Sequence, residues 1–182
     1  MSVVSLTTGY NNADGLRQRY GVNEVTVQRG GEYSRLADGR HLVEVTIDLL
    51  ALSTACTQAS GNHCIVADNV TIPNGAFIEQ VDVLVTKETA GSNANLDLGL
   101  VDQDRTTEID FNGLLAAADA FNGGTDLGTL TQYNVGTTEV GALVGTQITN
   151  TGLICANPET ADWTAGVIKA RIYYSMPTSA DV

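Results

Sequence analysis

Basic residues are scarce in this sequence, and their scarcity excludes one large class of partners. Its 182 residues include nine Lys and Arg against 21 Asp and Glu, which gives a formal net charge of -12. A surface of that sign repels phosphate backbones, so we expect no nucleic-acid partner. Long apolar runs are missing too, and no basic segment followed by an apolar core marks a signal peptide. We therefore expect a chain that is made in the cytoplasm and has no membrane partner.

Charged residues of both signs make up only 16% of the chain, and aromatic residues only 5%. So little charge argues against disorder and against long solvated helices, while 43% hydrophobic residues suffice for the core of one domain. The surface must therefore consist largely of Thr, Asn, Gln, Ser and Gly. Such a surface, with 19 glycines, is typical of short strands and turns, and it predicts an all-β fold.

The three cysteines are an odd number for a disulfide framework. In a reducing compartment each is best interpreted as a small buried apolar residue. A bridge from Cys56 to Cys64 would close a short loop and stays open as an alternative, whereas Cys155 is distant in sequence.

Alternation of apolar and polar residues predicts the strands. Residues 42–49 alternate strictly, as a half-buried strand does, and residues 77–86 alternate apart from a break in parity at Ile78 and Glu79 that indicates a bulge. We expect residues 96–101 to be the antiparallel partner of 77–86. Further strands are expected at 70–72, 128–135, 139–149, 152–156 and 166–176.

One short helix is predicted, over residues 112–121. Asn112 is a suitable cap, Leu114, Leu115, Ala118 and Phe121 share one helical face, and the glycines that follow end it. Seven or eight short strands with frequent turns then favour a two-sheet antiparallel β-sandwich of jelly-roll type over residues 41–182.

Residues 1–40 differ from the rest of the chain in both charge and pattern. Turn-forming residues interrupt them, and five arginines stand against four acidic residues, whereas residues 41–182 hold four basic against 17 acidic residues. We interpret this segment as an extended N-terminal arm that docks on another protein; packing on its own domain is the alternative. The candidate docking residues are Arg17, Arg19, Arg29, Arg35 and Arg40.

Trp163 is the other candidate for an interface, since it lies in a turn-rich segment just before the last strand. Covering the end of the sandwich is an equally good interpretation of this residue.

Catalytic and metal-binding patterns are not found. His41 and His63 stand alone, at a strand start and in a loop, and no nucleophile elbow or phosphate-binding loop is present. The acidic segment 102–110 offers oxygen ligands for Ca²⁺ but departs from the EF-hand pattern at Thr107 and Gly113, so a solvated turn is the preferred interpretation. We expect no enzyme activity, no catalytic residue, no metal and no cofactor.

The stretch VTIPNGAFIEQVDVLVTKETAGSNANLDLGLVD, residues 70–102, together with IDFNGL, residues 109–114, resembles small structural proteins of marine and cyanobacterial tailed phages. These are capsid decoration or cement proteins, and the resemblance covers about a third of the chain. It implies a β-sandwich on the capsid exterior, often a trimer, whose arm reaches the major capsid protein or a neighbouring copy.

Three function classes follow: a capsid decoration protein, a tail or neck component of the same virion, and a carbohydrate-binding jelly roll. The first is preferred because a polar, acidic product with an arginine-bearing arm suits a protein that folds alone and then binds a finished shell.

Overall fold

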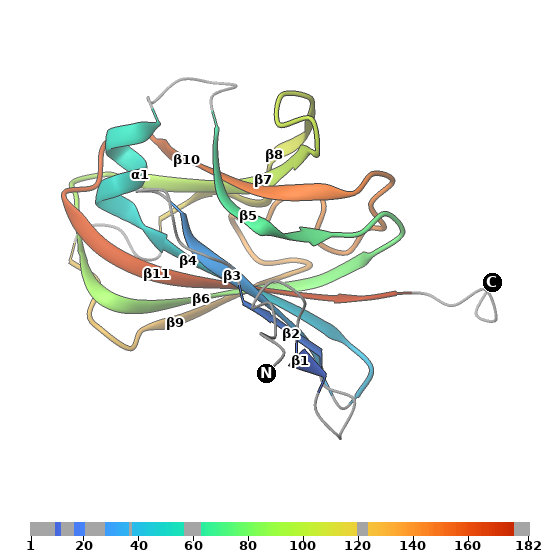
Figure 1. Cartoon of the computed structure of the whole chain (residues 1–182). Coiled ribbons are helices and arrows are strands. Elements are labelled where there is room, and N and C mark those ends of the chain that lie inside the picture. Colours follow the sequence, from blue (N-terminus) through green and yellow to red (C-terminus); the bar gives the residue numbers. More distant parts are fainter. Residues whose placement is uncertain are drawn as a thin grey trace, which may run out of the picture.

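The computed structural model is a two-layer β-sandwich with one short helix (Figure 1). It describes residues 10–11, 17–20, 28–36, 38–56, 63–119 and 124–176. Both sheets are antiparallel throughout, and their apolar faces meet in one core. The all-β sandwich expected from composition and alternation is therefore confirmed.

The larger sheet has seven strands and the smaller has four. In spatial order the larger sheet consists of β1 (Tyr10–Asn11), β2 (Arg17–Tyr20), β3 (Gln28–Arg35), β4 (His41–Asp48), β11 (Ala165–Ser175), β6 (Phe77–Ala90) and β9 (Leu130–Asn134). The smaller sheet consists of β5 (Cys64–Ile72), β10 (Gly152–Glu159), β7 (Asn95–Asp102) and β8 (Glu108–Ala118).

The strands from β4 onward follow the jelly-roll order. The run β4-β11-β6-β9 faces the run β5-β10-β7-β8, so the chain changes sheet after almost every strand. Only β7 and β8 are consecutive strands that pair with each other within these two runs. The expected pairing of residues 77–86 with 96–101 is wrong, because β6 pairs with β11 and β9 while β7 lies in the opposite sheet.

The core is built from alternate residues of the central strands. On β4, Val43, Val45 and Ile47 point inward, and on β11 the residues opposite them in register, Ile172, Ala170 and Ile168, do the same. Removing a Val or Ile side chain from water stabilises the fold by roughly 1.5–3 kcal/mol. The predicted bulge is confirmed: Tyr173 and Tyr174 of β11 pair with Gln80 and Ile78, which leaves Glu79 as the extra residue.

The described residues contain one helix, as predicted, but its predicted position is wrong. Residues 112–118 belong to strand β8, and the helix is α1 (Leu49–Ala55), directly after β4. The carboxylate of Asp48 accepts a hydrogen bond from the Ala51 backbone N–H at 3.1 Å and so caps the helix. Leu49 and Leu52 are buried one turn apart. Leu49 also continues the apolar alternation of β4, so the sequence pattern assigned this first helical residue to the strand.

Two other predicted boundaries also need correction. Residues 139–149 form turns and isolated bridges instead of a strand. Their backbone hydrogen bonds go partly to β8 and partly to β6: Gly141 N–H donates to Leu114 O, and Ile78 N–H donates to Thr146 O. Strand β5 begins at Cys64, well before the predicted start at residue 70.

The described part of the predicted arm lies in the large sheet. Strand β3 pairs with β4 from Gln28↔Ile47 to Arg35↔His41 and also lies beside β5 of the other sheet. Tyr33 of β3 packs against the core. Residues 28–35 therefore pack on their own domain, and β1 and β2 continue the sheet beyond them.

Candidate interaction surface

The five candidate arginines fall on or beside the N-terminal strands. Arg17 and Arg19 lie on β2 and Arg29 on β3, and their side chains are outside the described part of the chain. Arg35 ends β3 with its side chain exposed. Arg40 precedes β4, donates from Nε to Asp38 Oδ2 at 2.7 Å and lies over the Tyr173 ring, 5.6 Å from its centroid.

Trp163 is in the core. Its side chain is 1% exposed, and its backbone N–H donates to Ser53 Oγ of α1 at 2.8 Å. The segment between β10 and β11 thus folds its tryptophan inward at the end of the sandwich beneath α1. Of the two interpretations considered for this residue, the structure shows the covering role.

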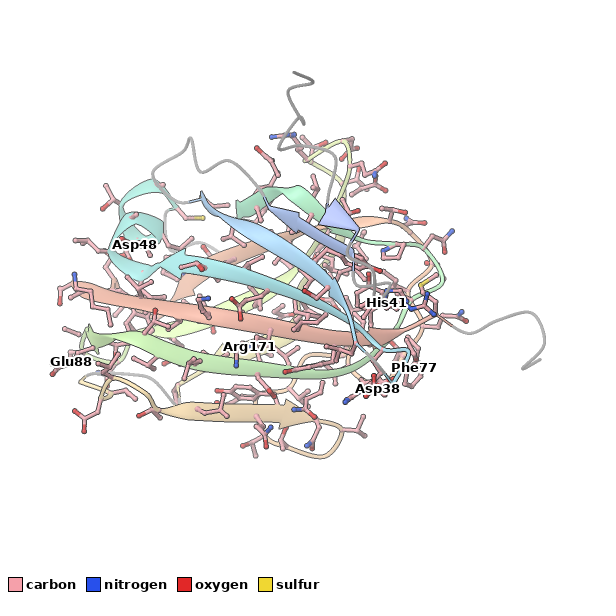
Figure 2. The ribbon with its side chains drawn as sticks, turned by 60° about the horizontal axis from the view of Figure 1, so that its bottom comes forward. Asp38, His41, Asp48, Phe77, Glu88 and Arg171 are labelled. Atoms are coloured by element: carbon pink, nitrogen blue, oxygen red, sulfur yellow. The ribbon has the colours of Figure 1, made fainter. Side chains whose placement is uncertain are left out.

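The outer face of the large sheet carries most of the basic residues of the sandwich. Residues 41–182 contain four basic residues. Three of them lie on the adjacent strands β6 and β11, namely Lys87, Lys169 and Arg171, and the fourth, Arg105, lies in the β7–β8 turn. Figure 2 looks onto this face, with Arg171 near its middle. The two lysines and Arg171 share it with five acidic residues of β4 and β6: Glu44, Asp48, Glu79, Asp82 and Glu88.

A cross-strand ion pair network occupies the middle of this face. Glu44 of β4 accepts hydrogen bonds from Lys169 Nζ and, at 2.7 Å, from Arg171 Nε, both on β11. Partial burial of Glu44 would raise its pKa, but the two cationic donors outweigh burial and hold the pKa below its ordinary value. Glu44 is therefore ionised at neutral pH. Three basic against five acidic residues leave this face, called the balanced face below, with a net charge of only -2.

The sequence did not single out this network. Lys169, Arg171 and Glu44 each appear as outward residues of an alternating strand, but their contact depends on the pairing of β4 with β11. Those strands are 117 or more residues apart in the chain, at opposite ends of the sandwich sequence. Alternation gives the face of each residue and not the register between strands.

The outer side of the small sheet has the opposite character. Its four strands and the β7–β8 turn contain seven acidic residues and one basic residue, Arg105, which pairs with Asp68 at 3.0 Å. The seven acidic residues are Asp68, Asp97, Asp102, Asp104, Glu108, Asp110 and Glu159. The sandwich thus has one nearly balanced face and one strongly acidic face.

Three carboxyls on this acidic side have raised pKa values. Burial is the main cause for Asp97, Asp110 and Glu159, and repulsion between neighbouring carboxylates adds to it. Asp97 keeps one partner, because its Oδ1 accepts the Ala117 backbone N–H at 2.8 Å. The folded chain therefore disfavours the charged form of these three carboxyls.

We expect the protein to gain thermal stability when the pH falls from 7 to about 5. Some carboxyls have a higher pKa in the folded chain than in the unfolded chain. Such a group adds its full stability at pH values below its unfolded-state pKa, and this stability is lost as the pH rises through its folded-state pKa. His41, whose pKa burial lowers, opposes this gain within the same pH range, because the unfolded chain takes up the imidazole proton first. Glu44 and Asp104, whose pKa values are lowered, act in the opposite direction only at more acidic pH. Melting curves should show a net rise of the melting temperature between pH 7 and pH 5, because three carboxyls favour it and one histidine opposes it.

The variant Asp97→Asn is the control for this rise. Its amide oxygen still accepts the Ala117 N–H but no longer titrates, so the variant should melt higher at pH 7 and gain less on acidification. A melting temperature that falls steadily from pH 7 to 5 in the parent chain would contradict the expectation.

The acidic segment 102–110 forms a tight turn that satisfies its own carboxylate. Asp104 accepts hydrogen bonds from the backbone N–H groups of Thr106 and Thr107, both at 2.8 Å, and from Thr107 Oγ1 at 2.6 Å. These bonds lower the pKa of Asp104 to about 2. Within the described part of the chain no three His, Cys, Asp or Glu side chains come close enough to hold a metal ion.

Both histidines lie where the sequence placed them. His41 begins β4; its ring bonds Tyr33 Oη and stacks on Tyr174, 5.0 Å between centroids, and burial lowers its pKa. His63 precedes β5 and stacks on Phe111 at 4.2 Å. Each is held by aromatic packing.

Exposed apolar side chains gather around β9, which is an edge strand of the large sheet. Leu127, which precedes the strand in the chain, and Val135, which follows it, are each 69% exposed, and Leu130 on the strand is 49% exposed. An edge strand presents unpaired backbone groups on one side. None of the helices in the described ranges is long and apolar enough to cross a membrane.

No protein-family model matches this sequence. No curated protein matches it either. Among solved structures, a chain in the acid-stable capsid of Helicobacter pylori bacteriophage KHP30 is 16% identical with a TM-score of 0.44, over 76% of this chain and 89% of that one. A chain of the cyanophage Pam1 capsid is 15% identical with a TM-score of 0.42, over 86% and 94% of the two chains.

A chain of the Ralstonia phage GP4 capsid is 15% identical with a TM-score of 0.45, over 87% of this chain and 91% of that one. Likeness at these TM-scores describes a resemblance in structure and assigns no function to this chain.

Proposed function

We propose that this chain is a non-enzymatic virion structural protein that decorates and stabilises a phage capsid by binding the major capsid protein. The observation that carries the proposal is the charge difference between the two outer faces of a jelly roll. One face is nearly balanced and carries three of the four basic residues of residues 41–182, and the other holds seven acidic residues against one basic residue. The segments that resemble decoration proteins lie on β5 to β8 of the same fold.

The balanced face is the better attachment surface. Docking the acidic face would bring many carboxylates out of water against a partner, with a single arginine to offset them. The face of β4, β11, β6 and β9 carries the Glu44 network, whose charges are already paired, and the exposed leucines beside β9 extend it. Attachment through this face leaves the acidic sheet pointing to solvent, where copies repel one another and the particles stay dispersed.

The N-terminal segment contributes to attachment in this proposal. Residues 1–27 hold Arg17 and Arg19, and the sheet continues through β1 and β2 at the edge opposite β9. A strand at a sheet edge can pair with a strand of another protein. The partner is the major capsid protein or a neighbouring copy. The proposed assembly is a homo-oligomer, and the specific expectation is a trimer.

Binding to capsid shells stripped of accessory proteins tests the proposal. The full chain should co-sediment with shells in proportion to the capsid lattice, and light scattering should give the mass of a discrete oligomer. Binding of a few copies at one vertex would instead identify a tail or neck component. No binding to shells, together with binding to glycans, would favour the carbohydrate-binding alternative.

We expect Lys169→Glu to weaken shell binding at least tenfold, and Arg105→Glu to leave it within about twofold. Both substitutions reverse one basic residue, but Lys169 lies on the balanced face and Arg105 on the acidic side. Loss of a charge-assisted contact at an interface has about this magnitude. Melting curves of both variants establish that they are folded, and equal binding by the two would overturn the choice of face.

Deleting residues 1–27 tests the N-terminal segment separately. This truncation keeps β3, whose Tyr33 packs on the core, so the sandwich stays intact. Full shell binding by the truncated chain would remove these residues from the attachment surface while leaving the balanced face in place.

A further inference from the structure

The thiols of Cys56 and Cys64 lie in contact between the two sheets. Cys56 follows the last residue of α1, and its Sγ lies 3.8 Å from Ala156 O and 3.4 Å from Asn157 Oδ1 on β10. Cys64 begins β5 directly opposite Ala156 in the strand register. Both thiols therefore lie beside Ala156 of β10, and each shifts the pKa of the other.

The third cysteine lies on the other side of the small sheet. Cys155 packs with Val101 and Leu153 under Phe111, on the outer face, whereas Cys56 and Cys64 belong to the core between the sheets. Cys155 is fully buried, and burial raises the pKa of its thiol to about 12. The fold thus pairs two of the three cysteines and separates the third.

We propose that Cys56 and Cys64 are a dithiol pair that forms an intramolecular disulfide when the folded chain meets a small disulfide oxidant such as oxidised glutathione. The inference rests on the position of the two thiols and is independent of the proposed function. The disulfide would join the end of α1, which directly follows strand β4 of the large sheet, to β5, an edge strand of the small sheet.

Cys64 is the thiol that reacts first. It is partly exposed, while Cys56 is buried at 3% exposure. The neighbouring Cys56 thiol lowers the pKa of Cys64, whereas the same interaction together with burial raises the pKa of Cys56. A thiolate that is both reachable and stabilised is the better nucleophile.

The reaction proceeds by two exchanges. The Cys64 thiolate attacks oxidised glutathione, which forms a mixed disulfide and releases one glutathione thiolate. Cys56 then loses its proton and attacks the Cys64 sulfur, which forms the Cys56–Cys64 bond and releases the second glutathione. The two cysteines lose two protons and two electrons in total, and one oxidised glutathione becomes two reduced molecules.

The bond should raise the melting temperature by about 5–10 °C. Closing the ring of residues 56–64 limits the unfolded chain, and the expected gain for a short ring corresponds to a shift of this size in a domain of about 180 residues. The hydrogen bond from Cys56 to Asn157 is lost on oxidation, which sets the lower end of the range.

The experiment treats the native full chain with oxidised glutathione and then compares mass, peptide map and melting temperature with those of the reduced chain. We expect the mass of two hydrogen atoms to be lost, a peptide that links Cys56 to Cys64, and a higher melting temperature that a reducing agent reverses. Cys155→Ser should behave like the parent chain. Cys56→Ser should stop at the mixed disulfide on Cys64, and its melting temperature should not rise.

A native parent chain that keeps glutathione on Cys64 without closing the ring would overturn the proposal, as would a linkage to Cys155. No change of mass in the folded chain would overturn it as well. Each outcome is independent of whether the chain binds capsid shells.

Discussion

Replacing Trp163 with alanine should lower the free energy of unfolding by about 3–5 kcal/mol, the usual cost of removing a fully buried large aromatic side chain. The indole is 1% exposed, and the backbone of the same residue is tied to Ser53 of α1. The cavity would open at the end of the sandwich, where the segment between β10 and β11 meets the helix. Urea unfolding followed by circular dichroism measures the loss.

Trp163→Phe is the matched control, because it keeps an apolar ring in the same place and should cost clearly less than the alanine variant. Shell binding distinguishes the two roles considered for this residue. A core residue affects binding only through the stability of the fold. If Trp163→Ala left stability unchanged and removed shell binding, the side chain would act at an interface and the buried placement would be wrong.

Local pattern was a good guide to the strands and a poor guide to their neighbours. The alternation in β4 and β11 gave both their bounds and their buried faces, since each residue two positions on returns to the same side. The pairing of β6 with β7 was wrongly expected because consecutive strands often pair, whereas a jelly roll carries the chain to the other sheet. Strand order depends on contacts between distant residues, which periodicity does not contain.

The misplaced helix shows a second limit. In residues 112–118 the apolar residues fit a helix of two turns as well as an irregular strand, because Leu114 and Leu115 are adjacent and both buried. The structure settles the choice through the close approach of Gly113 to residues 141–143. For α1 the sequence held a usable signal, since Asp48 precedes a run of good helix formers.

The candidate surface was predicted in part. Charge asymmetry drew attention to the N-terminal arginines, but the side chains of three of them lie outside the described residues. The Glu44 network and the contrast between the two faces emerged only when β4, β11 and β6 were placed side by side. Trp163 was ambiguous because turn-rich segments can fold an aromatic residue inward or outward, and composition does not distinguish the two.

Gly99→Ala should be strongly destabilising, because the added methyl group meets backbone atoms of the neighbouring strand. Gly99 lies on β7, where β8 crosses very close to it: a Cβ atom there would be 2.1 Å from Asp110 O and 2.3 Å from the carbonyl carbon of Phe111. The neighbours are backbone atoms and cannot rotate away. The register of β7 with β8 shifts at this point, from Leu98↔Leu115 to Leu100↔Asp110, so the crossing is part of the pairing itself.

To accept the methyl group, β8 must move off β7, which would uncover the apolar group that Phe111 shields on the outer face. We expect a loss of at least about 3 kcal/mol, or a chain that does not fold, because overpacking against backbone costs more than against flexible side chains. Chemical denaturation and the yield of soluble protein measure this. Gly124→Ala is the control: it has φ +98° but nothing within 4 Å, so backbone strain of about 1 kcal/mol is its whole cost. If Gly99→Ala were no more destabilising than Gly124→Ala, the close crossing of β8 over β7 would be incorrect.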